Sequence, residues 1–480
     1  MSLRNDSGSV LPVVLIFAAF AAIVATAFCI GQYTISSPFL SSPASFQASC
    51  TARSGIWKAI ELLGKPPADT LAKINTLDSM FNGKMFGKAT AAIHDSSHSA
   101  LAPDDTMRDV RPFYTDSFGT CSLVLTYRTC FKQLASIAEF RKFKKTVTVT
   151  MAGTAYTSSD TTCILESNVP VQFNGGTIEG KTKFLSAVQP VGKGPAAATT
   201  SAMADSFREN EVQQVVSYYS AQLTEKIDTL MPGAVLTVQS NESLSKIPDV
   251  VNAPLFIDGS HHDLVWREKR RIFVGGDVQV TGRVFIENVE FVSSGEVKFL
   301  DDAALRNVSV FCQGRLVIDD RASFSGNVLT NSTILVKQNG RVENKSVLVA
   351  YGIPAKTGKD TTSKKLSLPV SVFLLQNAFC DGAVISCGTP CGIKTDKGSV
   401  VNGVLWTRGP VCLLGALHGI LYAKSLIDEK TLSDMSIAGR GVSKATVNVL
   451  TGSIRRLPSV VDYPLPFFLG RTVLLSWQEG

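Results

Sequence analysis

The arrangement of apolar and polar residues changes along the chain. Residues 10–30 carry no charge and are almost wholly apolar, and at about 1.5 Å per residue they span roughly the 30 Å core of a bilayer. From Arg271 onward, apolar residues recur at every second position in short runs separated by polar turns that contain glycine. These patterns predict a membrane-spanning helix near the N-terminus and a series of short strands in the C-terminal half. Small residues at 25–27 leave a cleaved secretory signal open as an alternative.

A second helical pattern follows the apolar segment. Apolar residues recur at three- and four-residue steps between Phe46 and Leu63, which predicts an amphipathic helix. Pro38 and Pro43 lie before it. Because proline has no amide donor, we expect the helix to break between the apolar segment and this one.

Strand, linker and helix signals occupy the middle of the chain. Residues 122–127 and 145–151 read as strands, which predicts a small sheet packed on the amphipathic helix. Residues 192–204 are rich in Ala, Thr and Gly and predict a linker. A further helix is expected from the capping box formed by Ser206 and Glu209.

The strands of the C-terminal half recur in units of about 20 residues. Each strand is too short to bury a face alone, so the units are expected to stack as a parallel β-helix, in which neighbouring coils share one core. An insertion at 354–366 divides the units into two sets. The units open at Asn288, Asn307 and Asn331 and, after the insertion, at Gly382, Gly403 and Gly419.

The chain is therefore predicted to be mainly β, or α+β: a transmembrane helix, a small sheet and a C-terminal parallel β-helix. The predicted divisions are a leader at 1–8, the transmembrane and amphipathic helix at 9–65, a small β-rich region at 66–190, a linker and helix at 191–233, the β-helix at 234–424, and a tail at 425–480 that packs on the body.

Composition narrows the class of protein. The 480 residues include 47 Lys and Arg, 40 Asp and Glu, and 45% hydrophobic residues, which excludes collagen, wholesale disorder and a polytopic membrane protein. The net charge of +7 is mild and permits an acidic partner without demanding one. Basic runs at 141–145 and 267–271 are interpreted as solvated turns, and nucleic acid is not expected as a partner.

The N-terminus resembles a type IV prepilin. Its polar leader ends in Gly8, and the apolar segment begins after Ser9, so the resemblance implies cleavage between these two residues by a prepilin peptidase. Residues 46–63, with the run A-R-S-G-I, resemble PilX-like minor pilins and the K-type pseudopilins of type II secretion. Major pilins carry Glu at the position of Val13, and the K-type proteins lack it, which favours a minor, tip-like role. The resemblance covers about the first 65 residues.

The resemblance implies a structural protein rather than an enzyme, with no cofactor. We expect a single-pass protein of the inner membrane, with most of the chain periplasmic or displayed on the cell surface as a minor pilin or pseudopilin of a type IV pilus or secretion filament. Its implied partners are other pilin or pseudopilin subunits and prepilin peptidase. The β-helix is expected to mediate adhesion, with a surface polysaccharide or a host surface as its ligand.

Paired aspartates suggest the alternative of an anchored carbohydrate-active β-helix enzyme, a hydrolase or lyase. If eighteen residues make one coil, Asp301 and Asp302 stack on Asp319 and Asp320, and four carboxylates could act as acid and base or bind calcium. Aspartate also favours solvated turns, and no His or Arg-x-Lys partners are evident on these coils, so no catalytic residue is assigned.

Two other clusters are candidate metal or disulfide sites. His261 and His262 are adjacent and would point to opposite faces of a strand, so they are not expected to share a metal ion. The cysteine spacing is not that of a zinc knuckle, and no metal site is assigned. Outside the cytoplasm disulfides are favoured, with the pairing left open. The candidates are Cys121, Cys130, Cys380, Cys387, Cys391 and Cys412.

Overall fold

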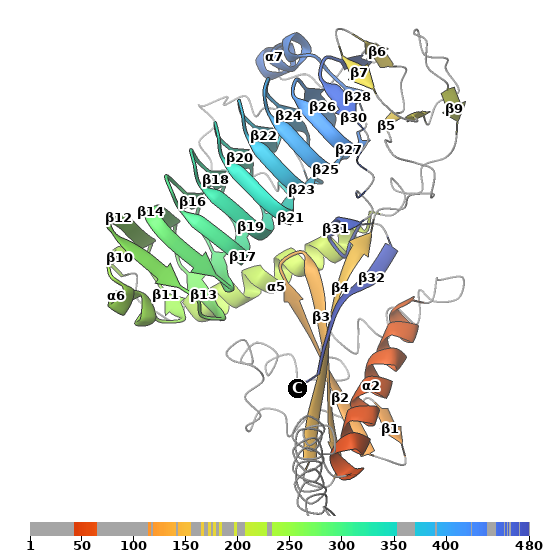
Figure 1. Cartoon of the computed structure of the whole chain (residues 1–480), viewed down its shortest axis with the longest axis vertical. Coiled ribbons are helices and arrows are strands. Elements are labelled where there is room, and N and C mark those ends of the chain that lie inside the picture. Colours follow the sequence, from red (N-terminus) through yellow and green to blue (C-terminus); the bar gives the residue numbers. More distant parts are fainter. Residues whose placement is uncertain are drawn as a thin grey trace, which may run out of the picture.

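The C-terminal half is a β-solenoid, and a small antiparallel sheet carrying one helix lies beneath it (Figure 1). The computed structural model describes residues 43–64, most of 114–154, short strands between 165 and 198, residues 207–227, 233–352, 370–438 apart from 389–390 and 424, and 448–479 apart from a few positions. The predicted mainly β architecture with a C-terminal solenoid is confirmed.

The solenoid consists of coils with three faces of parallel strands. The first face holds one strand from each coil, and the chain then turns onto the second and third faces, often within one continuous strand. The first face comprises β10 (Leu236–Val238), the first parts of β12 (Leu255–Trp266) and β14 (Val278–Glu287), then β16 (Val297–Phe299), β18 (Leu316–Ile318), β20 (Ile334–Val336), β22 (Val372–Leu374), β24 (Ile393–Thr395), β26 (Pro410–Leu413) and β28 (Ser425–Leu426).

The second and third faces complete each coil. The ends of β12 and β14 lie on the second face, and α6 (Asn241–Ser245) stands in the first coil ahead of β11. Strands confined to the third face are β11 (Val250–Val251), β13 (Arg270–Val274) and β15 (Val289–Ser293). Strands that run over both faces are β17 (Ala304–Cys312), β19 (Ser323–Thr330), β21 (Arg341–Ala350), β23 (Phe379–Ser386), β25 (Val400–Thr407) and β27 (Ala416–Tyr422).

One continuous apolar core fills the solenoid, because alternate residues of every strand point inward. Phe299 and Phe324, for example, are fully buried and stack with ring centroids 5.7 Å apart. At the corner before the third face, glycine stands where coils approach closely: a Cβ on Gly403 would lie 2.2 Å from the carbonyl oxygen of Gly382. Gly403 also has a φ of 129°, which side chains disfavour.

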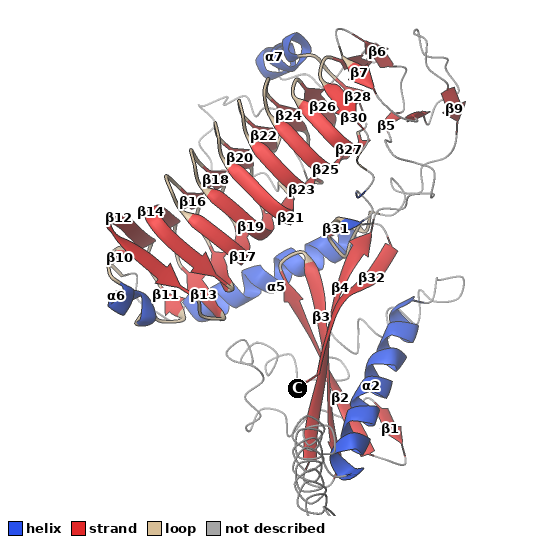
Figure 2. Ribbon diagram, viewed as in Figure 1, coloured by secondary structure: helices blue, strands red, loops and turns tan. Residues whose placement is uncertain are grey.

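The third face is buried on both sides. Its outer surface packs on α5 (Glu209–Ile227), the helix predicted from the capping box, through Val212, Val215 and Tyr219. Phe467 and Phe468, which lie in the predicted tail at 425–480, cover the same surface, since both belong to this cluster. Figure 2 shows α5 between the solenoid and the small sheet. This shared cluster joins the two parts of the molecule.

The small sheet is antiparallel and packs against α2 (Pro43–Gly64). The predicted apolar face of this helix is only partly right. Ala48, Ala52 and Ile56 are fully buried against the sheet, whereas Phe46 and Trp57 are exposed. Gly55 explains the difference, because a Cβ there would lie 2.4 Å from the Cys121 sulfur. The sheet comprises β1 (Tyr114–Asp116), β2 (Gly119–Arg128), β3 (Phe131–Phe140), β4 (Phe143–Thr154), β31 (Pro464–Leu465) and β32 (Arg471–Glu479).

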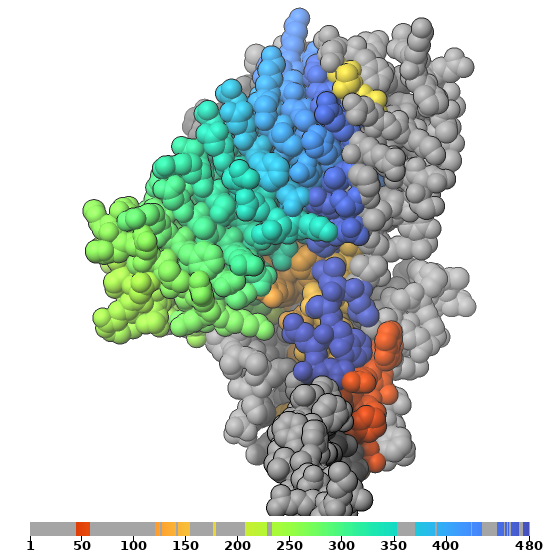
Figure 3. Space-filling view, in the orientation of Figure 1, coloured from red at the N-terminus to blue at the C-terminus, as the bar shows by residue number. Residues whose placement is uncertain are grey.

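The C-terminal segment differs from the predicted tail at 425–480. β32 pairs antiparallel with β4 and completes the small sheet, and the partly buried Trp477 packs against that sheet's core, beside Trp57 of α2. Figure 3 shows this segment, in dark blue, between the solenoid and α2. The remainder of the predicted tail contains β28, α7 (Glu429–Ala438), β29 (Asn448–Leu450) and β30 (Ser453–Arg455). Leu432 of α7 packs on the outside of the first face together with Cys412.

The predicted β-rich region at 66–190 contains β1 to β4 of the small sheet, and the predicted linker and helix at 191–233 contain α5. Part of both segments extends the solenoid, since β5 pairs with β27 and further strands pair in parallel beyond it. β6 forms a separate pair with β29. These strands are β5 (Leu165–Ser167), β6 (Val171–Phe173), β7 (Thr177–Ile178), β8 (Thr182–Phe184) and β9 (Ala196–Ala198).

The predicted membrane segment at 10–30 and the leader at 1–8 lie outside the described residues. Among the helices that the structure does describe, none has both the length and the hydropathy needed to cross a bilayer.

Candidate functional site

The joint between solenoid and small sheet contains a buried charge pair. Arg271 Nε donates to Glu290 Oε2 at 2.8 Å, and Tyr219 OH donates to Glu290 Oε1 at 2.6 Å. The Thr129 amide in the β2–β3 turn donates to Tyr219 OH at 2.7 Å, and Arg271 Nη2 donates to the Tyr127 carbonyl at 3.3 Å. The arrangement connects β13, β15, α5 and the hairpin, so it fixes how the solenoid sits on the sheet.

Burial controls the charge states in this joint. Burial acts to lower the pKa of Arg271, but the charge of Glu290, the neighbouring Tyr218 and Tyr219 and the hydrogen bond to Glu290 together outweigh it, and the pKa lies above its ordinary value. Burial, assisted by Glu290, holds the pKa of Tyr219 well above its usual range. Arg271 therefore stays cationic and Tyr219 stays a neutral donor, which suits a fixed structural joint. The predicted solvated turn at 267–271 is accordingly wrong for Arg271, whose side chain is only 11% exposed.

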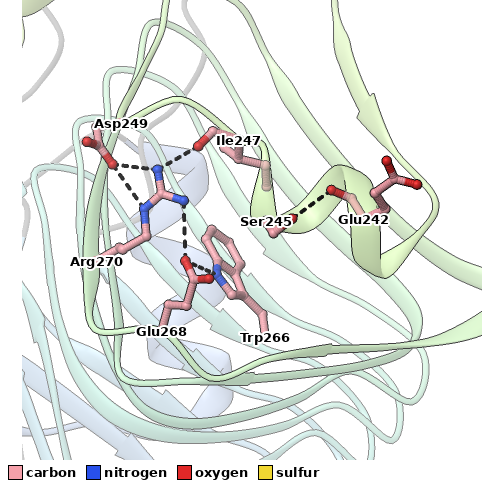
Figure 4. Close-up of polar contacts among 7 residues, drawn as sticks. All are labelled: Glu242, Ser245, Ile247, Asp249, Trp266, Glu268 and Arg270. Atoms are coloured by element: carbon pink, nitrogen blue, oxygen red, sulfur yellow. Dashed lines mark hydrogen bonds and ion pairs between the residues drawn. The ribbon is translucent and has the colours of Figure 1, made fainter.

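A second ion-pair cluster closes the N-terminal end of the solenoid (Figure 4). Arg270 Nε and Nη2 donate to Asp249 Oδ1 at 3.0 and 2.6 Å, and Nη2 also donates to the Ile247 carbonyl at 2.6 Å. Glu268 lies 3.4 Å from Arg270 and accepts from the indole of the buried Trp266 at 3.5 Å. This cluster joins the first coil to the second.

The paired aspartates do not form the predicted stack of four. Phe299 pairs with Ile318, so this coil is nineteen residues long rather than eighteen; Asp301 then aligns with Asp320, but Asp302 aligns with Arg321 instead of an aspartate. Asp302 and Arg321 form an ion pair at 3.4 Å. Asp319 pairs with Lys337, and Thr281 donates to Asp301. Asp320 accepts from Asn339 at 3.2 Å. Each carboxylate is thus engaged by a neighbour, and within the described residues no group of three or more metal-ligating side chains occurs.

The adjacent histidines lie in a bulge of β12. The register of β12 against β14 shifts between Gly259 and Leu264, and His261 and His262 are both exposed there. Neither histidine is buried, as a metal ligand usually is. The aspartates at this bulge have other partners: Ser260 Oγ donates to Asp258, and Arg283 contacts Asp263 at 3.0 Å.

The candidate cysteines lie in separate parts of the structure. Cys121 belongs to the core of the small sheet, whereas Cys130 lies in the cluster between sheet and solenoid. Cys380 lies inside the solenoid, Cys387 in the cluster on its third face and Cys412 beneath α7. The thiols of Cys130 and Cys387 donate to the carbonyls of Val328 and Ala350. No disulfide joins any two of the six candidates in the structure, and no four-thiolate site occurs among the described residues.

Burial should make these thiols unreactive. It raises the pKa of Cys312 and Cys412 to about 12 and that of Cys130, Cys380 and Cys387 above the usual range, so little thiolate forms near pH 8. Native protein treated with iodoacetamide at that pH should stay unmodified at these five positions by peptide mass spectrometry. Unreduced protein in urea should be alkylated at all five; a position that stays blocked there would reveal a disulfide.

A polar column on the second face was missed from the sequence. Asp381, Asn402 and His418 stand on successive coils and point outward, each immediately before a corner glycine. His418 Nδ1 lies 3.0 Å from Asn402 Oδ1, and Tyr463 OH donates to Asp381. The signal available in the sequence was the polar residue that precedes glycine on each of these three coils. The earlier part of the same column carries Glu287 and Arg306, which pair across neighbouring coils.

Comparisons with known proteins identify no family. No protein-family model matches the chain, and no curated protein matches it. Among solved structures, the crystal structure of competence-associated pilin ComZ from Thermus thermophilus aligns with 92% of this chain and 98% of its own, at 11% identity. Its TM-score is 0.17, and a likeness at that level carries no argument about fold or function.

Proposed function

We propose that this chain is a minor-pilin-like or pseudopilin-like structural protein that anchors in the inner membrane through residues 10–30 and displays its solenoid outside. The solenoid would serve surface interaction or adhesion, and the base formed by α2 and the small sheet would join other subunits of a pilus or secretion filament.

The outward face of α2 is the observation that carries this proposal. Phe46 and Trp57 are 62% and 57% exposed and lie eleven residues apart, which is about three helical turns, so they share one face. Leu474 and Leu475 of the neighbouring β32 are also exposed. This helix face also carries Arg53, which pairs with Glu479 at 2.7 Å, and Trp57 contacts Trp477 of β32. A helix face with exposed aromatic side chains, close after an apolar membrane segment, suits packing against the helices of other subunits, as in membrane helix association.

Processing provides the direct test. In a bacterium that contains prepilin peptidase, the mature chain should begin at Ser9 by mass spectrometry of the membrane fraction, and in a matched strain without the peptidase it should keep Met1. The variant Gly8→Val should remain unprocessed in both strains. An N-terminus that is the same in the two strains would contradict a prepilin.

The anchor can be tested separately. A chain without residues 1–35 should leave the membrane fraction and appear in the soluble fraction, because those residues contain the uncharged apolar segment. If the shortened chain still sediments with membranes, a single N-terminal anchor is wrong.

A further inference from the structure

The two ends of the small sheet have different surroundings. Figure 1 shows the solenoid and α5 at one end, where the Thr129 amide of the β2–β3 turn donates to Tyr219 of α5. At the other end β3 turns into β4, and Phe140 pairs with Phe143 across this turn. The β3–β4 turn therefore lies away from the solenoid. We name residues 140–145 the basic tip.

The helix α2 begins at the same end of the sheet as the basic tip. Arg53 of α2 pairs with Glu479, which stands opposite Val147 of β4. Four residues later along α2, Trp57 contacts Trp477, which lies two residues closer to the solenoid along β32. The helix thus starts beside the basic tip and runs toward the solenoid. A chain anchored through residues 10–30, which precede α2, presents the basic tip to the membrane surface.

The basic tip carries an excess of positive charge. Positions 141–145 hold four basic residues around one phenylalanine, in the order R-K-F-K-K. Lys144 is exposed and Lys145 is half-buried. Among the described residues at this end of the sheet, the carboxylates are those of Glu139, opposite Lys144, and Asp116, at the end of β1. Four cations and two carboxylates leave a net positive charge of two.

We propose that the basic tip binds anionic phospholipid headgroups of the membrane in which residues 10–30 are anchored. Basic groups are attracted to an anionic bilayer only within about one Debye length, so the end of the sheet beside the anchor is where such groups are effective. Phe143 adds an aromatic side chain of the kind that enters the headgroup region. This second attachment fixes the tilt of the small sheet and holds the solenoid away from the bilayer. The inference rests on the proposed anchor and names the lipid that the base contacts.

Lysine footprinting of the full chain in lipid nanodiscs tests the contact. A water-soluble N-hydroxysuccinimide ester acetylates accessible lysines, and peptide mass spectrometry gives the rate at each position. We expect Lys144 and Lys145 to react at least about threefold more slowly in discs that contain phosphatidylglycerol than in discs of phosphatidylcholine alone. High salt should abolish the difference, because it screens the attraction. Lys246 of α6, whose side chain is 70% exposed on the solenoid, should react equally in both discs.

Paired variants show whether the charge of the tip is responsible. Arg141→Gln/Lys142→Gln removes half of the basic residues and should reduce the protection of Lys144 to less than about twofold. The matched control, Arg283→Gln/Arg315→Gln, removes two exposed arginines of the solenoid and should leave that protection unchanged. The inference is overturned by equal rates in the two discs, by the same loss of protection in the control, or by equal protection from double-stranded DNA added to neutral discs.

The footprint and the processing test fail independently. Nanodiscs hold the chain whether or not the bond after Gly8 is cut, so lipid contact can be absent from a chain that begins at Ser9. If residues 10–30 do not anchor the chain, it stays out of the discs and the proposed function fails. The same footprint with free vesicles of the two compositions then tests the basic tip alone: slower reaction of Lys144 with anionic vesicles supports lipid binding, and equal rates overturn it.

Discussion

Replacement of Arg271 by alanine is expected to lower the free energy of unfolding by about 3–5 kcal/mol, because it leaves Glu290 buried without its cation. Urea titration followed by tryptophan fluorescence measures the loss. Hydrogen exchange localises it: the Thr129 amide, which donates to Tyr219, should exchange faster as the joint loosens.

Two matched variants separate the joint from a general effect of losing charge. Arg341→Ala removes an exposed ion pair with Glu343 and should cost at most about 1 kcal/mol. Arg271→Met combined with Glu290→Met removes both charges and should recover much of the stability lost by Arg271→Ala. Equal losses for Arg271→Ala and Arg341→Ala would show that the buried pair does not hold the joint.

Replacement of Gly403 by alanine is expected to cost about 3 kcal/mol or more. The new Cβ would meet the Gly382 carbonyl at 2.2 Å and the Tyr463 ring at 2.9 Å, and the residue would have to keep a φ of 129°. Rigid backbone on the neighbouring coil cannot move aside without breaking the ladder. Thermal unfolding with a far-ultraviolet circular dichroism signal reports the loss of solenoid strands.

Gly233→Ala is the control for this variant. A Cβ there meets its nearest atom, the Ala253 Cβ, at 3.6 Å, which is ordinary contact. Its stability should therefore change by less than about 1 kcal/mol. A loss similar to that of Gly403→Ala would mean that the corner geometry is not responsible.

The solenoid could be predicted from sequence because its signal is local and repeated. Inward residues two positions apart, such as Val297 and Phe299, mark each strand, and polar turns with glycine mark each corner. Asn288 and Asn307 recur at the corner before the third face of successive coils, with their side chains hydrogen-bonded at 2.6 Å. Asn331 does not continue this row; it lies in the turn after β19. A coil of nineteen rather than eighteen residues aligns only one aspartate pair, Asp301 with Asp320, and so removes the predicted stack of four.

Pairings between distant segments could not be predicted. β5 and β7 have three and two residues and pair with strands far along the chain, so they carry no periodic signal of their own. The sequence of β32 predicts only a hydrophobic tail, because its partner β4 lies far away along the chain. On α2, the large apolar side chains predicted which face is buried. The helix instead approaches the sheet closely at Gly55, so the face with small side chains is the buried one.

The place of β32 affects the order of synthesis. β1 to β4 leave the ribosome before the solenoid, but the edge of β4 is covered only by β31 and β32, which are translated after it. A chain interrupted anywhere in the solenoid would thus present an open strand edge suited to unwanted pairing. The small sheet can therefore be completed only after every coil has been translated. Quality-control proteases could distinguish finished from unfinished chains by this exposed edge of β4.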